Sequence, residues 1–382
     1  MESKQFLEEF QAGRRERTAG YQYFIPIPIN RQWKWKDAQL NTLLEKASRK
    51  IGELNSFARL VPNIDLFIQL HVMKEAVISS RIEGTRTNID EALLTEEDIR
   101  PERRDDWREV NNYTKALNAA INGLQQLPLS TRLLCQAHYT ILEGVRGKHK
   151  NPDEFRKSQN WIGGASLEDA VFIPPAHTYV SDLMGDLENF LHNDKIAVPA
   201  LIRIAIAHYQ FETIHPFLDG NGRIGRLLIT LYLVSEKILS QPLLYLSAFF
   251  EKDKGLYYDK LQFVREKNEI SSWLKYFLTG IYETADQATN TLSEMIKLKE
   301  NLESEIRRDM GRRTQSALTL LQQLFKHPVV QVKNVEQICR LSTKAANNLV
   351  ATFTKKGYLS EFSGQRRYRT FRFEPYLKLF SE

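Results

Sequence analysis

The sequence predicts a mostly α-helical protein that carries one β-hairpin and ends in a small basic α+β module. Apolar residues recur with a helical period over most of the chain from residue 37 to residue 310. Two short runs rich in β-forming residues flank a Gly-Gly turn within 155–175. After residue 314 the pattern changes to short helices followed by alternating charged and aromatic residues. We therefore expect four segments: an N-terminal helical region at 1–110, a helical core at 111–285, a helical connector at 286–313 and a small module at 314–382.

The order of the expected elements follows from local signals. Residues 1–36 are rich in aromatic side chains. We expect them to be extended, because the prolines of Ile25-Pro-Ile-Pro28 exclude a long helix there. From residue 37 onward, apolar stripes such as the one from Leu40 to Leu54 mark helices that bury one face. Further helices are expected at 64–83, 105–123, 130–143, 178–193, 199–212, 222–236, 256–266 and 270–284, and a polar helical connector at 286–310.

The C-terminal module has the pattern of a winged helix. A helix at 316–325 is followed by a helix-turn-helix pattern at 335–356 and a hairpin whose strands are 357–362 and 366–373, with the turn at 363–365. Residues 311–373 carry 12 Lys and Arg against 2 Glu, a net charge of +10. Because the whole chain is net +6, the remainder is net −4. A basic module on an acidic body is typical of nucleic-acid binding, but winged helices also bind proteins, so DNA and a partner protein both stay open for 314–373.

Composition limits the classes of protein to consider. Hydrophobic residues make up 42% and charged residues 26% of the chain, as in ordinary soluble proteins. No apolar run reaches the length of a membrane span, and the charged N-terminus lacks the apolar core of a signal peptide. Cys135 and Cys339 have no metal-like spacing, and we expect buried thiols in a reducing cytoplasm. No membrane partner is expected, and a homodimer stays open.

The most informative stretch is His215-Pro-Phe-Leu-Asp-Gly-Asn-Gly-Arg-Ile-Gly-Arg226, which lies between two expected helices. Gly220-Asn221-Gly222 falls at the start of the second helix, where free backbone N–H groups bind anions and glycines allow phosphates to approach. Arg223 and Arg226 lie three residues apart on one helix face and suit the outer phosphates of a nucleotide. Asp219 is a hard oxygen ligand for Mg²⁺, and a neutral His215 could accept a proton from a hydroxyl.

This stretch resembles the signature of the Fic family, His-Pro-Phe-x-Asp/Glu-Gly-Asn-Gly-Arg-x-x-Arg, at every specified position. The resemblance implies a Fic-type helical core and a protein adenylyltransferase, which transfers AMP from ATP to a Ser, Thr or Tyr hydroxyl of a target protein. It implies that His215 is the base and that Asp219 holds Mg²⁺. It further implies that the backbone of Gly220–Gly222 forms an anion hole and that Arg223 and Arg226 bind the outer phosphates.

A second motif resembles the inhibitory motif of class II Fic proteins. Ser79-Ser-Arg-Ile-Glu83-Gly84 matches Ser/Thr-x-x-x-Glu-Gly/Asn and lies N-terminal to the core. Gly84 marks a helix end, so Glu83 falls in a last turn where a carboxylate is electrostatically unfavourable. The resemblance implies that Glu83 pairs with Arg226, occupies the place of the γ-phosphate and makes ATP bind unproductively.

The hairpin at 155–175 resembles the flap of Fic proteins, which docks the target segment as an added strand. Asn160, Trp161, Ile162 and Gly163 match flap positions that touch ATP in relatives. Tyr257, Tyr258 and Asn268 fall where relatives contact adenine and ribose. An ordinary surface hairpin with Trp161 in the core, and aromatic packing of the two tyrosines, are the alternatives.

These observations together predict an autoinhibited protein adenylyltransferase that uses ATP and Mg²⁺ and also modifies itself. Two alternatives stay open. The same site could remove AMP from a modified target with the help of Glu83, or the chain could be a DNA-binding regulator whose core senses nucleotide.

Overall fold

The structure is a computed structural model that describes residues 10–18, 20–61, 64–361 and 369–380. Helices make up most of it, which confirms the mostly α-helical part of the predicted fold class, and the strands of its two sheets lie near the two ends of the chain. The helices are α1 (Ala38–Leu60), α2 (Asp65–Ile82), α3 (Ile89–Ala92), α4 (Arg104–Gly123), α5 (Thr131–Leu142), α6 (His177–His192), α7 (Ala200–Ile214), α8 (Asn221–Ser235), α9 (Ser247–Lys252), α10 (Lys254–Lys267), α11 (Ile270–Asp309), α12 (Thr314–Lys326), α13 (Val332–Cys339), α14 (Thr343–Lys355) and α15 (Glu374–Leu377). The strands are β1 (Gly13–Arg17), β2 (Gln22–Pro26), β3 (Val329–Gln331), β4 (Leu359–Glu361) and β5 (Thr370–Phe373).

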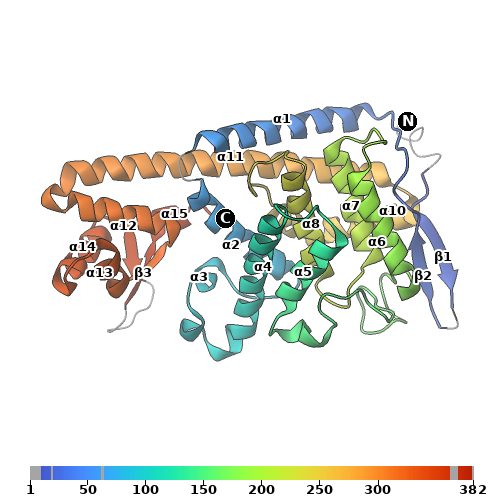
Figure 1. The fold of residues 1–382 in the computed structure, drawn as a ribbon, viewed down its shortest axis with the longest axis horizontal. Helices are drawn as coiled ribbons and strands as arrows, with labels where there is room; N and C mark the ends of the chain where they lie inside the picture. The colour runs from blue at the N-terminus through green and yellow to red at the C-terminus, as the bar shows by residue number, and fades with distance from the viewer. Residues whose placement is uncertain (1–9, 19, 62–63, 362–368, 381–382) are drawn as a thin grey trace.

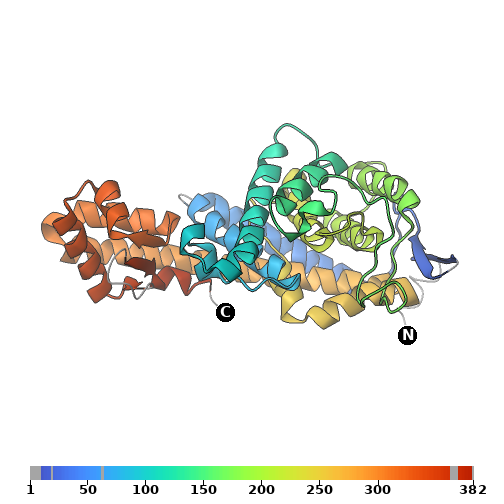
Figure 2. The ribbon, with the colours of Figure 1, turned by 90° about the horizontal axis from the view of Figure 1, so that it is seen from below.

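Helices α7 and α8 form the centre of the core. Every residue of α7 from Leu201 to Ile214 is buried, as its sequence, apolar on nearly every face, predicts. Figures 1 and 2 show α7 and α8 enclosed by α5, α6, α10 and α11. The loop that joins α7 to α8 is therefore held at both ends by the most buried helices of the protein.

The longest helix, α11, runs the length of the molecule beside α1 and carries the C-terminal module at its far end (Figure 1). Its buried positions recur along one face, with Trp273, Phe277 and Ile281 near its start and Ile306 near its end. The helix expected at 270–284 does not stop there, because no Gly or Pro occurs between residue 285 and Gly311. The expected connector is thus mostly a continuation of a core helix.

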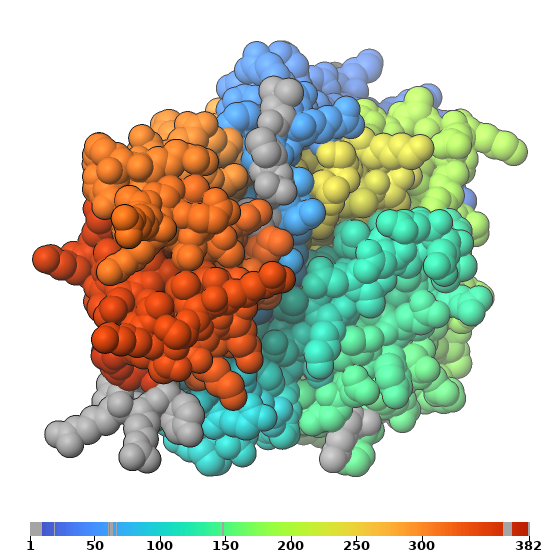
Figure 3. All heavy atoms as spheres, turned by 60° about the vertical axis from the view of Figure 1, so that its left-hand side comes forward, coloured from blue at the N-terminus to red at the C-terminus, as the bar shows by residue number. Residues whose placement is uncertain are grey.

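The described part of the C-terminal module contains the helices α12 to α15 and a small antiparallel sheet with strand order β3-β5-β4. The predicted hairpin is present as β4 and β5, while its predicted turn lies outside the described residues. The module contacts α2 and α3: the rings of Phe380 and Phe67 of α2 are 5.8 Å apart, and Arg372 forms a 2.9 Å ion pair with Asp90 of α3. A cleft of about 800 Å³ separates the module from α2 and α4 (Figure 3).

The N-terminal segment is extended as expected over its two strands, which also pair as the hairpin β1–β2, with Gly13 opposite Pro26; this pairing was not predicted. The two cysteines are also not fully buried as predicted; both are half-buried free thiols, on α5 and at the end of α13, helices that keep one side near solvent. Among the described residues, no helix combines the length and apolar composition of a bilayer span.

His208 joins three helices in the core and supplies a test of the fold. Its Nδ1–H donates to the Gly225 carbonyl of α8 (2.9 Å), and its Nε2 accepts from the Tyr257 hydroxyl of α10 (3.0 Å). Burial lowers the pKa of His208 to about 3, from 6.5. Below pH 6.5 this histidine therefore binds a proton in the unfolded chain but stays neutral in the native protein. The free energy of unfolding accordingly falls as pH falls.

We predict that His208→Gln flattens the pH dependence of the free energy of unfolding between about pH 6 and pH 4. One titrating group contributes about 1.4 kcal/mol per pH unit in that window, and the wild type should be steeper by about that amount. Urea unfolding of both proteins across the window measures the two slopes. Equal slopes would mean that His208 is protonated in the native protein.

Candidate functional site

The loop between α7 and α8 has a conformation that only a few residue types allow. His215 ends α7 in the left-handed region at φ 50°, and Gly220 precedes α8 at φ 76°. Asn221 closes the loop: its Oδ1 accepts from the Phe217 N–H (2.8 Å), and its Nδ2 donates to the Phe217 carbonyl (2.8 Å). Asn221 is thus a structural residue of the loop, and the first N–H groups of α8 stay available for an anion.

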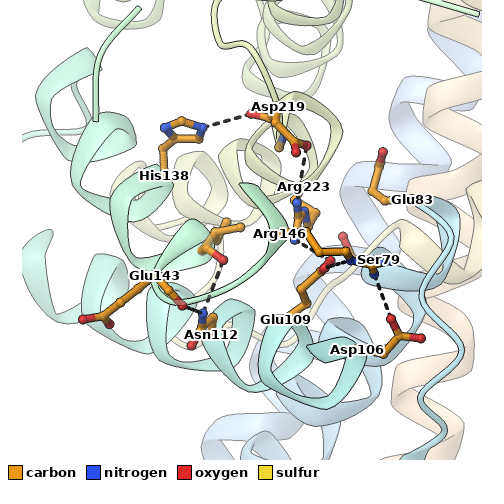
Figure 4. Close-up of polar contacts among 12 residues, drawn as sticks. Ser79, Glu83, Asp106, Glu109, Asn112, His138, Glu143, Arg146, Asp219 and Arg223 are labelled. Carbon is orange, nitrogen blue, oxygen red and sulfur yellow. Dashed lines mark hydrogen bonds and ion pairs between the residues drawn. The ribbon is translucent and has the colours of Figure 1, made fainter. Parts of the chain in front are cut away.

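His138 on α5 supports the same loop and was not found by sequence reasoning. Its ring stacks on Phe217 with centroids 3.8 Å apart, and its Nε2–H donates to the Asp219 carbonyl (2.9 Å; Figure 4). Its Nδ1 accepts from the Asp153 N–H (3.2 Å), which fixes the tautomer. Burial lowers the pKa of His138 to about 4, so the ring stays neutral. A histidine in the middle of an amphipathic helix gives no local signal for this role.

Arg156 and Asn160 attach the expected flap to the loop. The buried Arg156 donates from Nε to the His215 carbonyl (3.0 Å) and from its guanidinium to the Pro175 carbonyl at the end of the flap. Asn160 donates from Nδ2 to the carbonyls of His215 (3.2 Å) and Phe217 (2.9 Å). Burial lowers the pKa of Arg156 to about 10. These two side chains fix the flap to the histidine backbone, a role that the sequence did not indicate for Arg156.

The flap itself is a minimal hairpin. Ile162 and Phe172 exchange two backbone hydrogen bonds of 2.8 and 3.1 Å as an isolated bridge. The Phe24 N–H of β2 donates to the Ile173 carbonyl (3.0 Å), so the N-terminal hairpin supports the flap from behind. Trp161 is 40% exposed and Val171 is 68% exposed. Trp161 therefore does not pack in the core.

A cavity of about 490 Å³ lies between the flap, the start of α8 and α10. This volume is within the range of small-molecule sites. The predicted site residues that line it are Glu83, Trp161, Ile162, Gly163, His215, Gly222, Arg226, Tyr257 and Tyr258. Those absent from its lining are Ser79, Asn160, Asp219, Gly220, Asn221, Arg223 and Asn268.

Glu83 lies over the start of α8. It is the C-cap of α2, and its Oε1 accepts from the buried Arg226 guanidinium at 2.7 Å. A Cβ on Gly222 would stand 2.3 Å from this oxygen, so only glycine admits the carboxylate there. Burial acts to raise the pKa of Glu83, but the charge of Arg226 lowers it overall, so Glu83 is ionised. A carboxylate thus already occupies the position where a helix start attracts anions.

Arg223 belongs to a different chain of charges. Its guanidinium lies 3.3 Å from Glu109 of α4 and 3.7 Å from Asp219 (Figure 4). Glu109 in turn accepts from Arg146 (2.9 Å). The Asp219 carboxylate also accepts from the Gly220 N–H (2.6 Å), and its side chain is 44% exposed. Arg223 and Arg226 therefore have different carboxylate partners, although both point from the first turns of α8.

His215 lines the cavity with a neutral ring. Burial lowers the pKa of His215 to about 3, and its Nδ1 has no hydrogen-bond partner among the described residues. Glu212, one turn earlier, also lines the cavity, and burial raises its pKa to about 7. Sequence reasoning missed Glu212, because a single Glu in an apolar helix resembles an exposed position.

The residues expected near adenine and ribose separate into two groups. Tyr257 is buried beneath the cavity, while Tyr258 is 42% exposed at its edge. Asn268 ends α10 in the left-handed region, and its Oδ1 accepts from the Ala12 N–H (2.8 Å). Lys254, which was not predicted, lines the cavity and donates from Nζ to the Ile82 carbonyl at the end of α2.

Comparison with known proteins places this geometry in a family. Residues 41–122 match the model of the Fic/DOC family N-terminal region, and residues 128–233 match that of the Fic/DOC family itself. A probable protein adenylyltransferase of Aquifex aeolicus is 27% identical over 196 residues, which are 50% of this chain and 58% of the relative. Protein adenylyltransferase Fic of Drosophila erecta is 27% identical over 198 residues, 50% of this chain and 36% of that protein.

Solved structures show the same fold at low identity. A Fic family protein from Desulfovibrio desulfuricans superposes with a TM-score of 0.57 at 19% identity, covering 90% of this chain and 98% of the other. A Fic domain containing signaling protein from Bacteroides thetaiotaomicron gives 0.52 at 19% identity, covering 67% and 97%. The matches to the two curated relatives span 58% and 36% of their lengths. With both family regions matched in sequence and the fold matched in structure, the chain belongs to the Fic/DOC family.

Proposed function

We propose that this protein is an ATP:protein adenylyltransferase held inactive by Glu83. The observation that carries the proposal is one cavity that contains a neutral histidine, a glycine-lined helix start and a buried arginine, His215, Gly222 and Arg226. Curated relatives named protein adenylyltransferase support the activity. Ser, Thr and Tyr hydroxyls of a target protein, and of the chain itself, are the acceptors.

The proposed reaction is a displacement at the α-phosphorus of ATP. The hydroxyl oxygen of the target attacks phosphorus, the bond to the β-phosphate oxygen breaks, and pyrophosphate leaves. The proton of the hydroxyl passes to the neutral imidazole of His215. The N–H groups at the start of α8 and the Arg226 guanidinium bind the phosphates, so catalysis comes mainly from positioning and charge. The flap edge near Trp161 and Val171 orients the target segment.

A magnesium ion fits the residues at Asp219. Nucleotide-bound Mg²⁺ usually takes one or two carboxylates and completes its shell with phosphates and water. Asp219 is one half-exposed carboxylate beside the helix start. The described residues hold no cluster of three or more metal-ligating side chains, which fits an ion that arrives with the nucleotide. When bound, the ion would neutralise charge on the phosphates and the leaving pyrophosphate.

Autoinhibition follows from competition for Arg226. The Glu83 carboxylate and an outer phosphate of ATP are both anions that require the same guanidinium and the same space above Gly222. With Glu83 in place, the phosphates of ATP shift and the α-phosphorus is not presented in line to the hydroxyl. Removal of AMP from a modified target with the help of Glu83 would use the same site, and loss of label from the modified protein reports it.

We predict that His215→Ala lowers AMP transfer by about a hundredfold or more while leaving ATP binding nearly unchanged. The imidazole acts on the incoming hydroxyl, and removal of a general base has an effect of that size. Labelled AMP incorporated into the protein itself measures transfer, and calorimetry measures ATP binding. Transfer at the wild-type rate by a folded variant would refute the role of His215.

We predict that Glu83→Gly raises AMP transfer more than tenfold, whereas Arg226→Ala does not. The Arg226 guanidinium is buried while the Glu83 side chain is 33% exposed, so we expect loss of the pair to cost about 1.4 kcal/mol or somewhat more, and 1.4 kcal/mol corresponds to tenfold in rate. Arg226→Ala removes the partner of Glu83 and the phosphate ligand together. The same incorporation assay compares the variants. Equal activity of Glu83→Gly and wild type would contradict autoinhibition, and activation by Arg226→Ala would contradict phosphate binding by Arg226.

The C-terminal module is proposed as a second functional unit, a winged helix at 314–382 that binds duplex DNA. Its element order α12-β3-α13-α14-β4-β5 supports this topology. Helix α14 exposes Lys344 and Asn348 on the side away from the module core, as a recognition helix does. We likewise retain 1–110, 111–285 and 286–313 as proposed units, with α11 crossing the boundary at 285.

We predict that Lys344→Ala weakens binding to duplex DNA and makes the dependence of log K on log salt shallower by about one. The reason is that a lysine on a DNA phosphate releases about one counterion. Shift assays over a series of salt concentrations measure both slopes. A protein partner for the module would be favoured if the wild type bound DNA with an affinity that does not change with salt, or did not bind DNA even at low salt.

A further inference from the structure

The inhibitory carboxylate lies at the tip of α2, so its position depends on what holds that helix. Glu75, Ser79 and Glu83 are spaced by four residues and therefore share one face of the helix. Ser79 is fully buried, and its hydroxyl and carbonyl oxygens both accept from Arg226 at 2.8 Å. Two successive turns of α2 thus contact the same arginine.

The third residue of this face, Glu75, makes no hydrogen bond to Arg226 and instead binds two other helices. Its Oε1 accepts from the Tyr113 hydroxyl of α4 (3.0 Å) and from the Ser247 hydroxyl of α9. Glu75 is 4% exposed, Tyr113 is 1% exposed and Ser247 is fully buried. We call these three residues the Glu75 cluster. Neither the motif nor the cavity includes any of them.

A buried carboxyl is costly unless its oxygens are satisfied by directed hydrogen bonds. Because such bonds are directional, they fix both the rotation and the axial position of the helix that carries them. Moving Glu83 away from Arg226 by turning or sliding α2 would pull Oε1 away from both hydroxyls. Leaving that oxygen buried and unbonded adds to the free energy of releasing Glu83.

We propose that Glu75 is a positioning residue that holds Glu83 on Arg226 through its hydrogen bonds to Tyr113 and Ser247. This inference rests on the proposed autoinhibition by Glu83. It adds α4 and α9 to the inhibitory contact, which otherwise involves only α2 and α8. Burial raises the pKa of Glu75 to about 7, so its function rests on accepting hydrogen bonds rather than on a fixed charge.

The test compares substitutions at the Glu75 cluster in two backgrounds, wild type and Glu83→Gly. Tyr113→Phe and Ser247→Ala each delete one donor, Glu75→Leu deletes the acceptor, and Glu75→Gln keeps an acceptor oxygen at the same place. Incorporation of labelled AMP into the protein itself is measured, with thermal melting as the check on folding. Tyr209→Phe is the control, because Tyr209 is 2% exposed and its hydroxyl has no partner among the described residues.

In the wild-type background we expect Tyr113→Phe and Ser247→Ala each to raise transfer by about two- to tenfold, the range that one net hydrogen bond supplies. Glu75→Leu should raise it further, and Glu75→Gln and Tyr209→Phe should stay within about twofold of wild type. In the Glu83→Gly background none of the cluster variants should raise transfer, because the contact that they loosen is already gone.

Three outcomes would overturn the inference while leaving the proposed function intact. They are unchanged transfer in folded Tyr113→Phe and Ser247→Ala, an equal rise in both backgrounds, or a loss in both backgrounds. If Glu83→Gly itself gives no rise over wild type, autoinhibition fails and the inference falls with it. Tyr113→Phe and Ser247→Ala delete one hydroxyl each on different helices, so if one of these variants unfolds, the other still decides the question.

Discussion

The ion pair between Glu83 and Arg226 is the contact on which the proposed account depends. It brings the end of α2 to the start of α8, with a carboxylate at 2.7 Å from a buried guanidinium and no space for a Cβ at Gly222. A helix start with an adjacent arginine is an anion site, and here the chain supplies its own anion. In the proposed mechanism the same geometry would bind the phosphates and, with Glu83 in place, prevent their productive binding.

The surrounding structure keeps this contact in register. The loop from His215 to Gly220 is fixed by Asn221 on one side and by His138 on the other, and Arg156 and Asn160 attach the flap to it. These hydrogen bonds end on backbone carbonyl and N–H groups. These backbone contacts hold the loop in one shape, and of its residues His215 lines the cavity.

Sequence reasoning succeeded where the signal is local. Helical periods located α4 to α8 within two residues, and the resemblance of two motifs to Fic motifs implied the contact between Glu83 and Arg226. It missed what depends on tertiary packing: the pairing of β1 with β2, the continuation of α11 past residue 285, and the roles of His138, Arg156 and Glu212. Asn160 and Asn268 do not line the cavity; each hydrogen-bonds to backbone groups of a segment distant in sequence, which local patterns cannot show.

In the proposed mechanism, Glu83 competes with the outer phosphates of the nucleotide and with no other part of it. Calorimetric titration of wild type and Glu83→Gly with ATP and with AMP tests it most directly, because AMP lacks the phosphates that would reach Arg226. We expect the substitution to increase the affinity for ATP about tenfold or more, which corresponds to roughly 1.4 kcal/mol of binding free energy, and to leave the affinity for AMP unchanged. An equal gain in affinity for ATP and AMP, or no gain for either, would contradict this mechanism.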